Sequence, residues 1–182
     1  MSRDLLEAGQ LANDLLSTEL PRRFAHVQGV ALRVTEVLRP TQKERRELLQ
    51  VSGLLHDIGY ASKLQETGFH PIDGARHLRS IGFDPRVVNL VAHHSCARIE
   101  ARLRGLDEVL LDEFPIDESL PHDEVCFCDM TTSPSGEPIT VEGRLSEIQA
   151  RYGPGSIVHR FVDEARGELL ASVNRVQAKL NQ

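Results

Sequence analysis

The fold is decided by residues 54–59, Leu-Leu-His-Asp-Ile-Gly, in which a histidine and an aspartate stand side by side at the end of an apolar helical segment. His56 and Asp57 are residue types that are seldom buried unless they are paired or bind a metal. Gly59 follows at once, and glycine commonly ends a helix because it tolerates a left-handed backbone. We therefore expect a helix that ends by presenting a nitrogen ligand and an oxygen ligand at one point.

The composition favours helix packing around this point. The chain has 182 residues, of which 40% are hydrophobic but only 4% aromatic, and it contains no Trp. The core must therefore consist mainly of Leu, Val, Ile and Ala, and the length suits one domain. Apolar residues recur at helical spacing, and no alternating pattern typical of strands appears. We predict an all-α fold that forms a single domain over residues 1–182.

Helix start and stop signals divide the chain. Proline at the first helical position is favourable, and Asp84-Pro85 adds an N-cap acid before it. We expect helices over residues 3–16, from Pro21 until before Pro40, up to His56-Asp57, from Pro71 to beyond residue 81, from Pro85 to His93-His94, and over 122–130, 140–151 and 156–180. The acidic residues 106–124 are expected to form a solvated surface segment, with a short helix and a covering loop that acts as a lid as the alternative, and a loop is expected in 131–138.

Charge and cysteine content exclude several classes of function. The net charge of −6 provides no general attraction to nucleic acid, so we exclude a protein that coats duplexes. Three cysteines provide no disulfide framework, so we expect a reducing cytoplasm. No stretch approaches the roughly 20 apolar residues of a membrane span. An anionic substrate would require a local positive centre, which a bound metal can supply.

Several side chains that can bind a metal follow or interrupt the apolar segments of different expected helices. They are His26, His56, Asp57, His70, His93, His94 and Asp129. A single histidine of this kind is more often a hydrogen-bonded core or surface residue. Helix bundles, however, build metal sites from side chains on facing helices. Imidazole and carboxylate together suit one or two divalent ions, with Fe, Mn, Co, Mg, Ni and Zn all left open.

The set is large enough for two ions. His26, His56, Asp57 and Asp129 would hold one ion, and Asp57, His70 and His94 would hold the other. Asp57 would then bridge them, and two ions about 3.5–4 Å apart can hold a hydroxide for in-line attack at phosphorus. His93 and His94 are neighbours that point about 100° apart on a helix, so we do not expect both to bind one ion.

The order His…His-Asp…His…His…Asp, centred on His56-Asp57-Ile58-Gly59, resembles the HD-domain superfamily of metal-dependent phosphohydrolases in its HDIG form. The resemblance covers about residues 20–132 and leaves the C-terminal helices, about 140–180, outside it. It implies a compact all-α bundle around a metal centre. The residues that match the family's ligands are His26, His56, Asp57, His70, His94 and Asp129, with His94 favoured over His93.

The resemblance also implies an activity, which is hydrolysis of a small phosphate ester, such as a nucleotide, by a metal-bound hydroxide. In the mechanism that we expect, Asp57 would orient the hydroxide, Arg23 would stabilise charge on the phosphoryl oxygens, and His93 or another nearby group would protonate the leaving oxygen. Arg23, Lys63 and Arg98 are the candidates for binding the substrate. Many members have a lysine directly after the glycine of this motif, where the present chain has Tyr60.

Two other classes of function remain open. Some HD folds are di-iron oxygenases, and the same ligands would bind iron there. A non-catalytic signalling module that keeps its metal for stability is the third class, although the intact ligand set argues against it. As partners we expect a small phosphorylated substrate, no duplex nucleic acid and no membrane, and a homodimer is left open.

Overall fold

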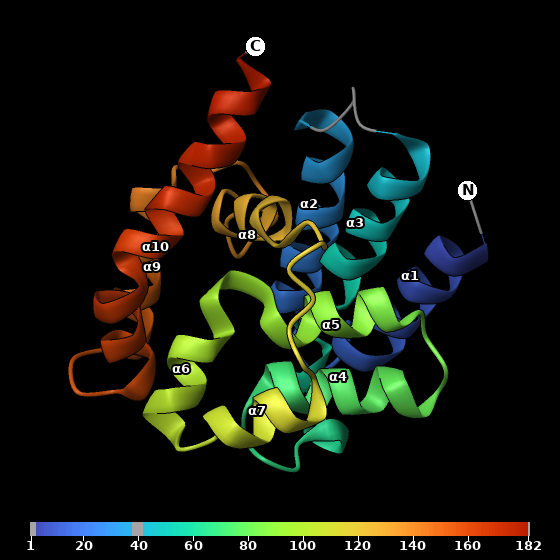
Figure 1. Cartoon of the computed structure of the whole chain (residues 1–182), viewed down its shortest axis with the longest axis horizontal. Helices are drawn as coiled ribbons and strands as arrows, with labels where there is room; N and C mark the ends of the chain where they lie inside the picture. The colour runs from blue at the N-terminus through green and yellow to red at the C-terminus, as the bar shows by residue number, and fades with distance from the viewer. Residues whose placement is uncertain (1–2, 38–41, 182) are drawn as a thin grey trace.

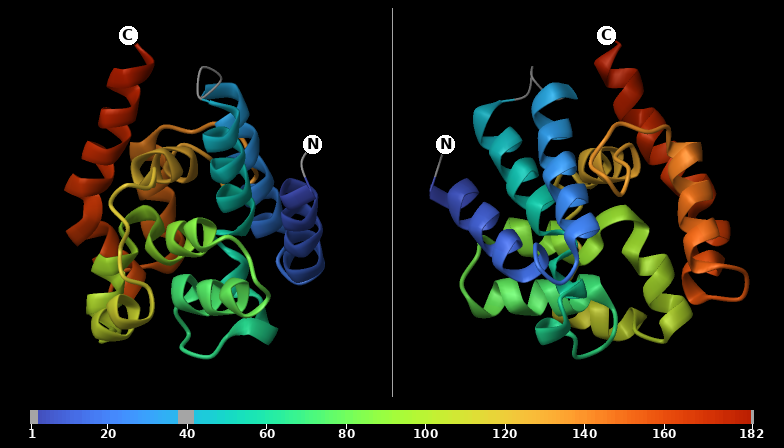
Figure 2. Two further views of the ribbon diagram at one scale, coloured as in Figure 1. Left: turned by 45° about the vertical axis from the view of Figure 1, so that its right-hand side comes forward. Right: turned by 180° about the vertical axis from the view of Figure 1, so that it is seen from behind.

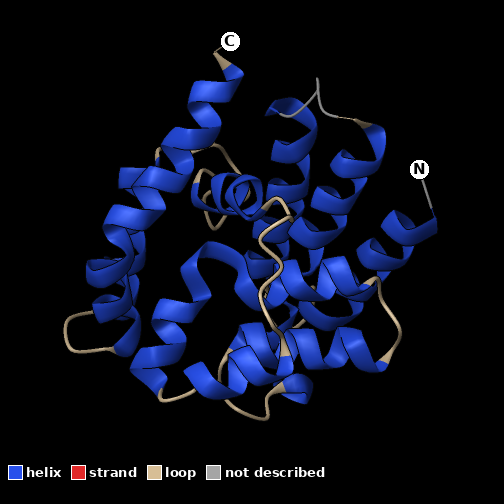
Figure 3. Cartoon of the chain, viewed as in Figure 1, coloured by secondary structure: helices blue, strands red, loops and turns tan. Residues whose placement is uncertain are grey.

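The computed structural model describes residues 3–37 and 42–181, and these residues form a helical bundle (Figure 1). Within these ranges no strand is present, and the extended pairing is limited to an isolated bridge between Thr132 and Pro138 (Figure 3). The prediction of an all-α fold is confirmed.

The helices in chain order are α1 (Arg3–Leu16), α2 (Pro21–Val37), α3 (Lys43–Leu55), α4 (His70–Ser80), α5 (Pro85–His93), α6 (Ala97–Arg104), α7 (Asp107–Glu113), α8 (His122–Met130), α9 (Val141–Tyr152) and α10 (Ile157–Leu180). Short 3-10 turns are η1 (Ile58–Tyr60), η2 (Ser62–Leu64) and η3 (His94–Cys96). The bounds agree closely with the expected helices. Helix α6 was not predicted, α3 ends before His56, and Pro40 lies outside the described residues.

Side-chain caps start two of the helices at the positions where the structure has them. The side chain of Asp84 accepts a hydrogen bond from the Arg86 amide at 2.8 Å, and Pro85 occupies the first turn of α5. The hydroxyl of Thr140 accepts from the Gly143 amide at 3.1 Å and starts α9. Each cap satisfies an amide that has no partner within its own helix. These caps set where α5 and α9 begin.

The helices pack in two groups that meet along α2 and α3. Helices α2 and α3 form an antiparallel pair, α1 packs against α3, and the α4–α5 hairpin lies across their lower ends (Figure 1). On the opposite side, the long helix α10 packs against α8 and α9 (Figure 2). The polar residues singled out in the sequence come from helix ends and faces where these two groups join.

Two apolar cores support the two groups. The first contains Leu16, Leu55 and Ile72, all fully buried, and the second contains Leu145 and Leu169. Complete burial of one such side chain contributes about 1.5–3 kcal/mol. Helix α2 supplies residues to both cores, so it is held from two sides. In the part of the chain that is described, no helix combines the length and apolarity needed to cross a bilayer.

Candidate metal centre

The six predicted metal ligands come together in the interior. Nitrogen and oxygen atoms that lie within 4.8 Å of one another form three overlapping groups among the described residues. The groups are His26, His56 and Asp57; His56, His94 and Asp129; and Asp57, His70 and His94. The ligands come from α2, the segment after α3, the start of α4, the turn after α5, and α8. Residues 103 positions apart, His26 and Asp129, are thus in contact.

Three of the histidines are oriented by backbone carbonyl groups. The Nδ1 atoms of His26, His56 and His94 lie 3.0, 2.8 and 2.7 Å from the carbonyl oxygens of Ser133, Gly53 and Val91. A carbonyl oxygen can only accept, so each Nδ1 must carry the proton. The Nε2 atom of each neutral ring is then a bare acceptor. This is the arrangement by which histidines that bind metals in proteins are usually oriented.

The bare nitrogens point toward other acceptors. Nε2 of His56 is buried without any hydrogen-bond partner and lies 3.6 Å from Asp57 Oδ2 and 3.8 Å from Asp129 Oδ1. Nε2 of His94 lies 3.1 Å from Nε2 of His70. Buried acceptors that face acceptors are costly unless a cation lies between them. The cluster therefore fits a divalent metal, because such an ion accepts lone pairs from imidazole and carboxylate alike.

Asp57 joins two of the ligand groups. Its Oδ2 atom lies 3.6 Å from His56 Nε2, whereas its Oδ1 atom lies 3.4 Å from His70 Nε2. The two oxygens of one carboxylate thus face different histidines. This geometry suits a residue shared by two ions, which is the role predicted for Asp57.

The surroundings keep the carboxylates ionised and favour the neutral form of two of the imidazoles. Burial alone would raise the pKa of Asp57, but Arg23 and the nearby histidines outweigh it and hold that pKa well below its usual range. The pKa of Asp129 is lowered in the same way, against burial, by His26 and His56. Burial lowers the pKa of His70 and of His94. These are the protonation states that metal ligands require.

Arg23, Tyr60 and His70 form a stack beside Asp57. The Arg23 guanidinium donates a hydrogen bond to Asp57 Oδ2 and lies 3.5 Å from the centre of the Tyr60 ring. The Tyr60 ring in turn stacks on His70, with the ring centres 4.0 Å apart and the planes inclined by 19°. Tyr60, the residue directly after Gly59, therefore supports both a ligand and the arginine next to it.

Backbone strain positions another residue that the sequence did not reveal. Ser95 and Cys96, directly after His94, have positive φ angles of 46° and 61°. This left-handed conformation is unfavourable for residues other than glycine, and such strain is concentrated at functional sites. The Ser95 hydroxyl donates a hydrogen bond to Asp129 Oδ2. The strained turn thus places Ser95 where it holds one of the ligands.

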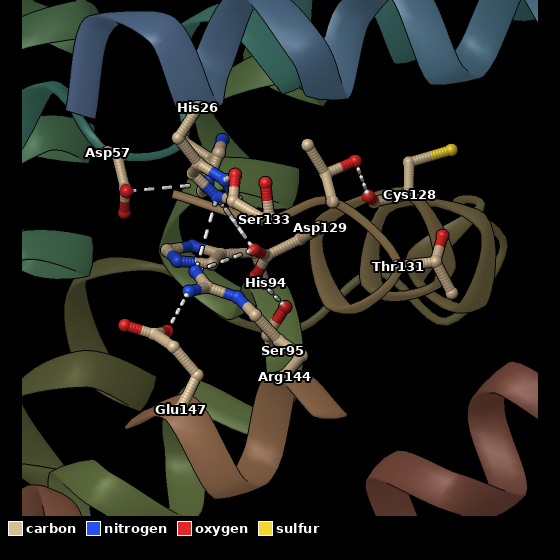
Figure 4. Close-up of polar contacts among 12 residues, drawn as sticks. His26, Asp57, His94, Ser95, Cys128, Asp129, Thr131, Ser133, Arg144 and Glu147 are labelled. Carbon is tan, nitrogen blue, oxygen red and sulfur yellow. Dashed lines mark hydrogen bonds and ion pairs between the residues drawn. The ribbon is translucent and has the colours of Figure 1, made fainter. Parts of the chain in front are cut away.

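Helix α9 adds arginines to the site, which we did not expect. Nη2 of Arg144 lies 3.5 Å from His26 Nε2 and 3.9 Å from Asp129 Oδ1. In Figure 4, His26 enters from α2 and Arg144 from α9, and both approach Asp129. A pocket at the cluster is lined by Arg144 and Arg151, and also by Tyr152 and Phe161 from this C-terminal part. The sequence analysis assigned no role to residues 140–180, and the structure brings side chains of α9 to the cluster.

Three of the predicted catalytic or substrate-binding residues are not brought to the cluster. Nε2 of His93 lies 2.6 Å from the carbonyl oxygen of Phe114, so His93 is committed to the segment after α7. Arg98 is exposed and pairs with Asp107 at 2.9 Å. Lys63 is exposed on η2. None of the three lines the pocket at the cluster, whereas Arg23 does.

The two adjacent histidines should therefore differ in their effect on metal content. The chain leaves the helical conformation between them, because α5 ends at His93 and His94 has φ −61° and ψ 150°. We expect His94→Gln to lose bound metal. His93→Gln should retain it and lose only about 1 kcal/mol of stability, the net contribution of one hydrogen bond. Elemental analysis and urea unfolding of both variants check this, and loss of metal from His93→Gln alone would contradict it.

The glycine of the central motif has a role different from the one expected. Gly59 is not among the residues with positive φ, so it does not end a helix by a left-handed turn. A Cβ atom at this position would lie 2.1 Å from the His70 carbonyl oxygen and 2.6 Å from the Gly74 amide nitrogen. Only glycine allows this approach of η1 to α4. The close contact brings His70 to the ligands at residues 56–57.

Comparison with protein families identifies the same region. The family model described as HD domain matches residues 23–145, and this segment extends beyond residue 132, where we expected the resemblance to end. Searches of curated proteins and of solved structures gave no match. The match covers more than half of the chain and contains all six ligands as well as Arg144. The chain thus belongs to the HD-domain superfamily of metal-dependent phosphohydrolases.

Proposed function

We propose that this protein is a metal-dependent hydrolase that acts on a small phosphate ester and that its substrate is a nucleotide. The observation that carries this proposal is the set of imidazole Nε2 atoms that converge on two buried carboxylates, three of them on rings whose Nδ1 atoms are bonded to backbone carbonyl groups. The unpartnered Nε2 of His56 is the clearest member of the set. Arginines beside the cluster favour an anionic substrate over the uncharged substrates that an oxygenase could take.

The protein groups around the cluster have distinct roles in this proposal. His26, His56, Asp57, His70, His94 and Asp129 would hold one or two divalent ions. Bound ions would supply a Lewis acid and lower the pKa of a coordinated water so that it can attack phosphorus. Arg23 and Arg144 would bind phosphoryl oxygens, since both line the pocket and approach the ligands. His93 has no part, because its Nε2 is bonded to Phe114.

Aromatic side chains from the C-terminal helices support a nucleotide as the organic part. Only 4% of the residues are aromatic, which leaves few side chains on which a base could stack. The folded chain nevertheless places Tyr152 and Phe161 on the wall of the pocket at the cluster. Aromatic faces of this kind pack well against planar rings.

Metal analysis combined with a screen for phosphate release tests the proposal. Purified protein should contain a transition metal, and with Mn²⁺ or Co²⁺ it should release phosphate from a nucleotide in the absence of oxygen. His56→Ala should abolish this release, because it removes the nitrogen that lies between both carboxylates. Its circular dichroism spectrum should stay helical. An enzyme that consumes oxygen and releases no phosphate would be an oxygenase, and full activity of His56→Ala would refute the proposed site.

A further inference from the structure

Helix α9 presents two arginines on one face next to the metal centre. Arg144 and Arg151 are seven residues apart, which is close to two full turns, so they project in nearly the same direction. Glu147 lies between them on the same face. Nη1 of Arg144 lies 2.7 Å from Glu147 Oε2, and Nη2 of Arg151 lies 2.5 Å from the same oxygen. One carboxylate thus holds two guanidinium groups side by side.

Arg144 is buried in a way that leaves part of its guanidinium unsatisfied. The residue is 6% exposed, and its Nε atom is buried without a hydrogen-bond partner. Its other contacts are to Glu147 and to the metal ligands His26 and Asp129 (Figure 4). A buried cation with an unused donor is costly unless a further acceptor is supplied. The orphaned donor indicates an anionic ligand that is absent from the protein itself.

The acids around these arginines are shared between them or make other contacts. Glu147 is shared by both of them, whereas Asp57 and Asp129 belong to the metal ligands. Glu100, on the wall of the same pocket, pairs with Arg104 at 2.6 Å. Glu19, on the outer side, accepts hydrogen bonds from Ser62. When a metal takes up Asp129, Glu147 is the acid that the described contacts leave to the two guanidinium groups, so one positive charge of the pair is not offset by a contact.

The arginines stand at the boundary between two cavities. The pocket at the cluster has a volume of only about 80 Å³. A larger cavity of about 320 Å³ lies on the outer side and is lined by Arg22, Pro134 and Leu20. Arg23, Arg144 and Arg151 line both cavities. A group at the cluster and a second group in the outer cavity would therefore contact the same arginines from two sides.

We infer that Arg144 and Arg151 form a second anion site that binds the phosphate next to the reacting one, so that the substrate contains two adjacent phosphates. This inference rests on the proposed function, because it places the reacting phosphate at the metal centre. The planar guanidinium fork suits phosphate oxygens, and charged hydrogen bonds of this kind are among the stronger ones. The outer cavity provides room for the second phosphate and for the organic group attached to it.

The binding of two non-reacting probes tests this site without relying on activity. Inorganic phosphate and methylenediphosphonate, a stable analogue of a diphosphate, would be titrated calorimetrically into the metal-loaded protein with metal ion in excess throughout. We expect the diphosphonate to bind about tenfold more tightly than phosphate in the unmodified protein. Arg151→Gln should weaken diphosphonate binding about tenfold and change phosphate binding less than twofold. The Arg151 side chain is 35% exposed, so this substitution should leave the fold intact.

Arg160→Gln is the matched control, because Arg160 is an exposed arginine on α10 that lines neither cavity. It makes the same change of charge and should alter neither affinity. Equal binding of both probes by the unmodified protein, or an unchanged ratio in Arg151→Gln, would overturn the inference. If the protein hydrolyses phosphate esters but Arg151→Gln leaves the ratio of the two affinities unchanged, only the second anion site is refuted. If the protein hydrolyses no ester, the proposed function is refuted. The ratio of the two affinities would still show whether Arg144 and Arg151 form an anion site.

Discussion

Replacing Asp57 by asparagine is expected to remove most of the bound metal and to reduce phosphate release by about 10³-fold, the scale seen when a central electrostatic group is lost. The two carboxylate oxygens of Asp57 face different histidines, at 3.6 Å from His56 and 3.4 Å from His70. An amide offers one oxygen, has no charge and presents an NH₂ group on its other side. Elemental analysis and a phosphate assay on the same preparation measure both effects.

Asp73→Asn is the control for this substitution. Asp73 is also a buried aspartate, 2% exposed, but its oxygens accept hydrogen bonds from Thr67 and Gly68 at the start of α4. We expect this variant to lose stability and to retain its metal. Normal metal content in Asp57→Asn would contradict the assignment of Asp57 as the shared ligand, and metal loss in both variants would point to a general effect of buried charge.

Gly59→Ala is expected to destabilise the protein by about 3 kcal/mol, near the upper end of what overpacking usually costs. The added Cβ would meet the His70 carbonyl oxygen at 2.1 Å, and a backbone group cannot rotate away as a side chain can. The segment after α3 and helix α4 must therefore separate. Since His70 is the first residue of α4, its Nε2 should move away from Asp57 and metal affinity should fall as well.

Gly167→Ala is the control that shows whether the loss of stability in Gly59→Ala depends on the position of the glycine or on the added methyl group alone. Gly167 lies inside α10, and a Cβ atom there would meet nothing within 4 Å. Alanine is a better helix former than glycine, so we expect a gain of about 0.5–1 kcal/mol. Urea unfolding of both variants, with metal content measured alongside, separates the two cases. A Gly59→Ala protein as stable as the unmodified chain would show that η1 and α4 do not need their close contact.

The helices could largely be predicted because their signals are local. Proline and an N-cap acid at residues 84–85 start α5 as expected, and apolar residues at helical spacing mark α1 and α10. A cap acts within one turn, and an apolar face is set by spacing alone. Helix α6 was not predicted, since it is only eight residues long and comes directly after the strained turn at Ser95 and Cys96.

The candidate ligands could also be found from the sequence, because residue type and position narrow the choice. Histidine and aspartate at the ends of apolar segments are few, so their order along the chain is informative. His93 meets the same criterion, and Arg98 was a candidate for binding the substrate, yet the fold directs them to Phe114 and Asp107. Residue type and sequence position do not tell where a side chain at a helix end will point.

By itself, the sequence determined the helical class, most helix bounds, and the small set of histidine and aspartate residues that are candidates for binding a metal. Only the tertiary structure decided that Arg144 and Arg151 border the cluster and that Gly59 allows the contact with α4. It also decided that the Nε2 atom of His56 faces the carboxylate of Asp57. The physical reason is the range of the interactions. Periodicity and capping act over a few residues, whereas the site forms where two apolar cores bring together segments that are far apart in the chain.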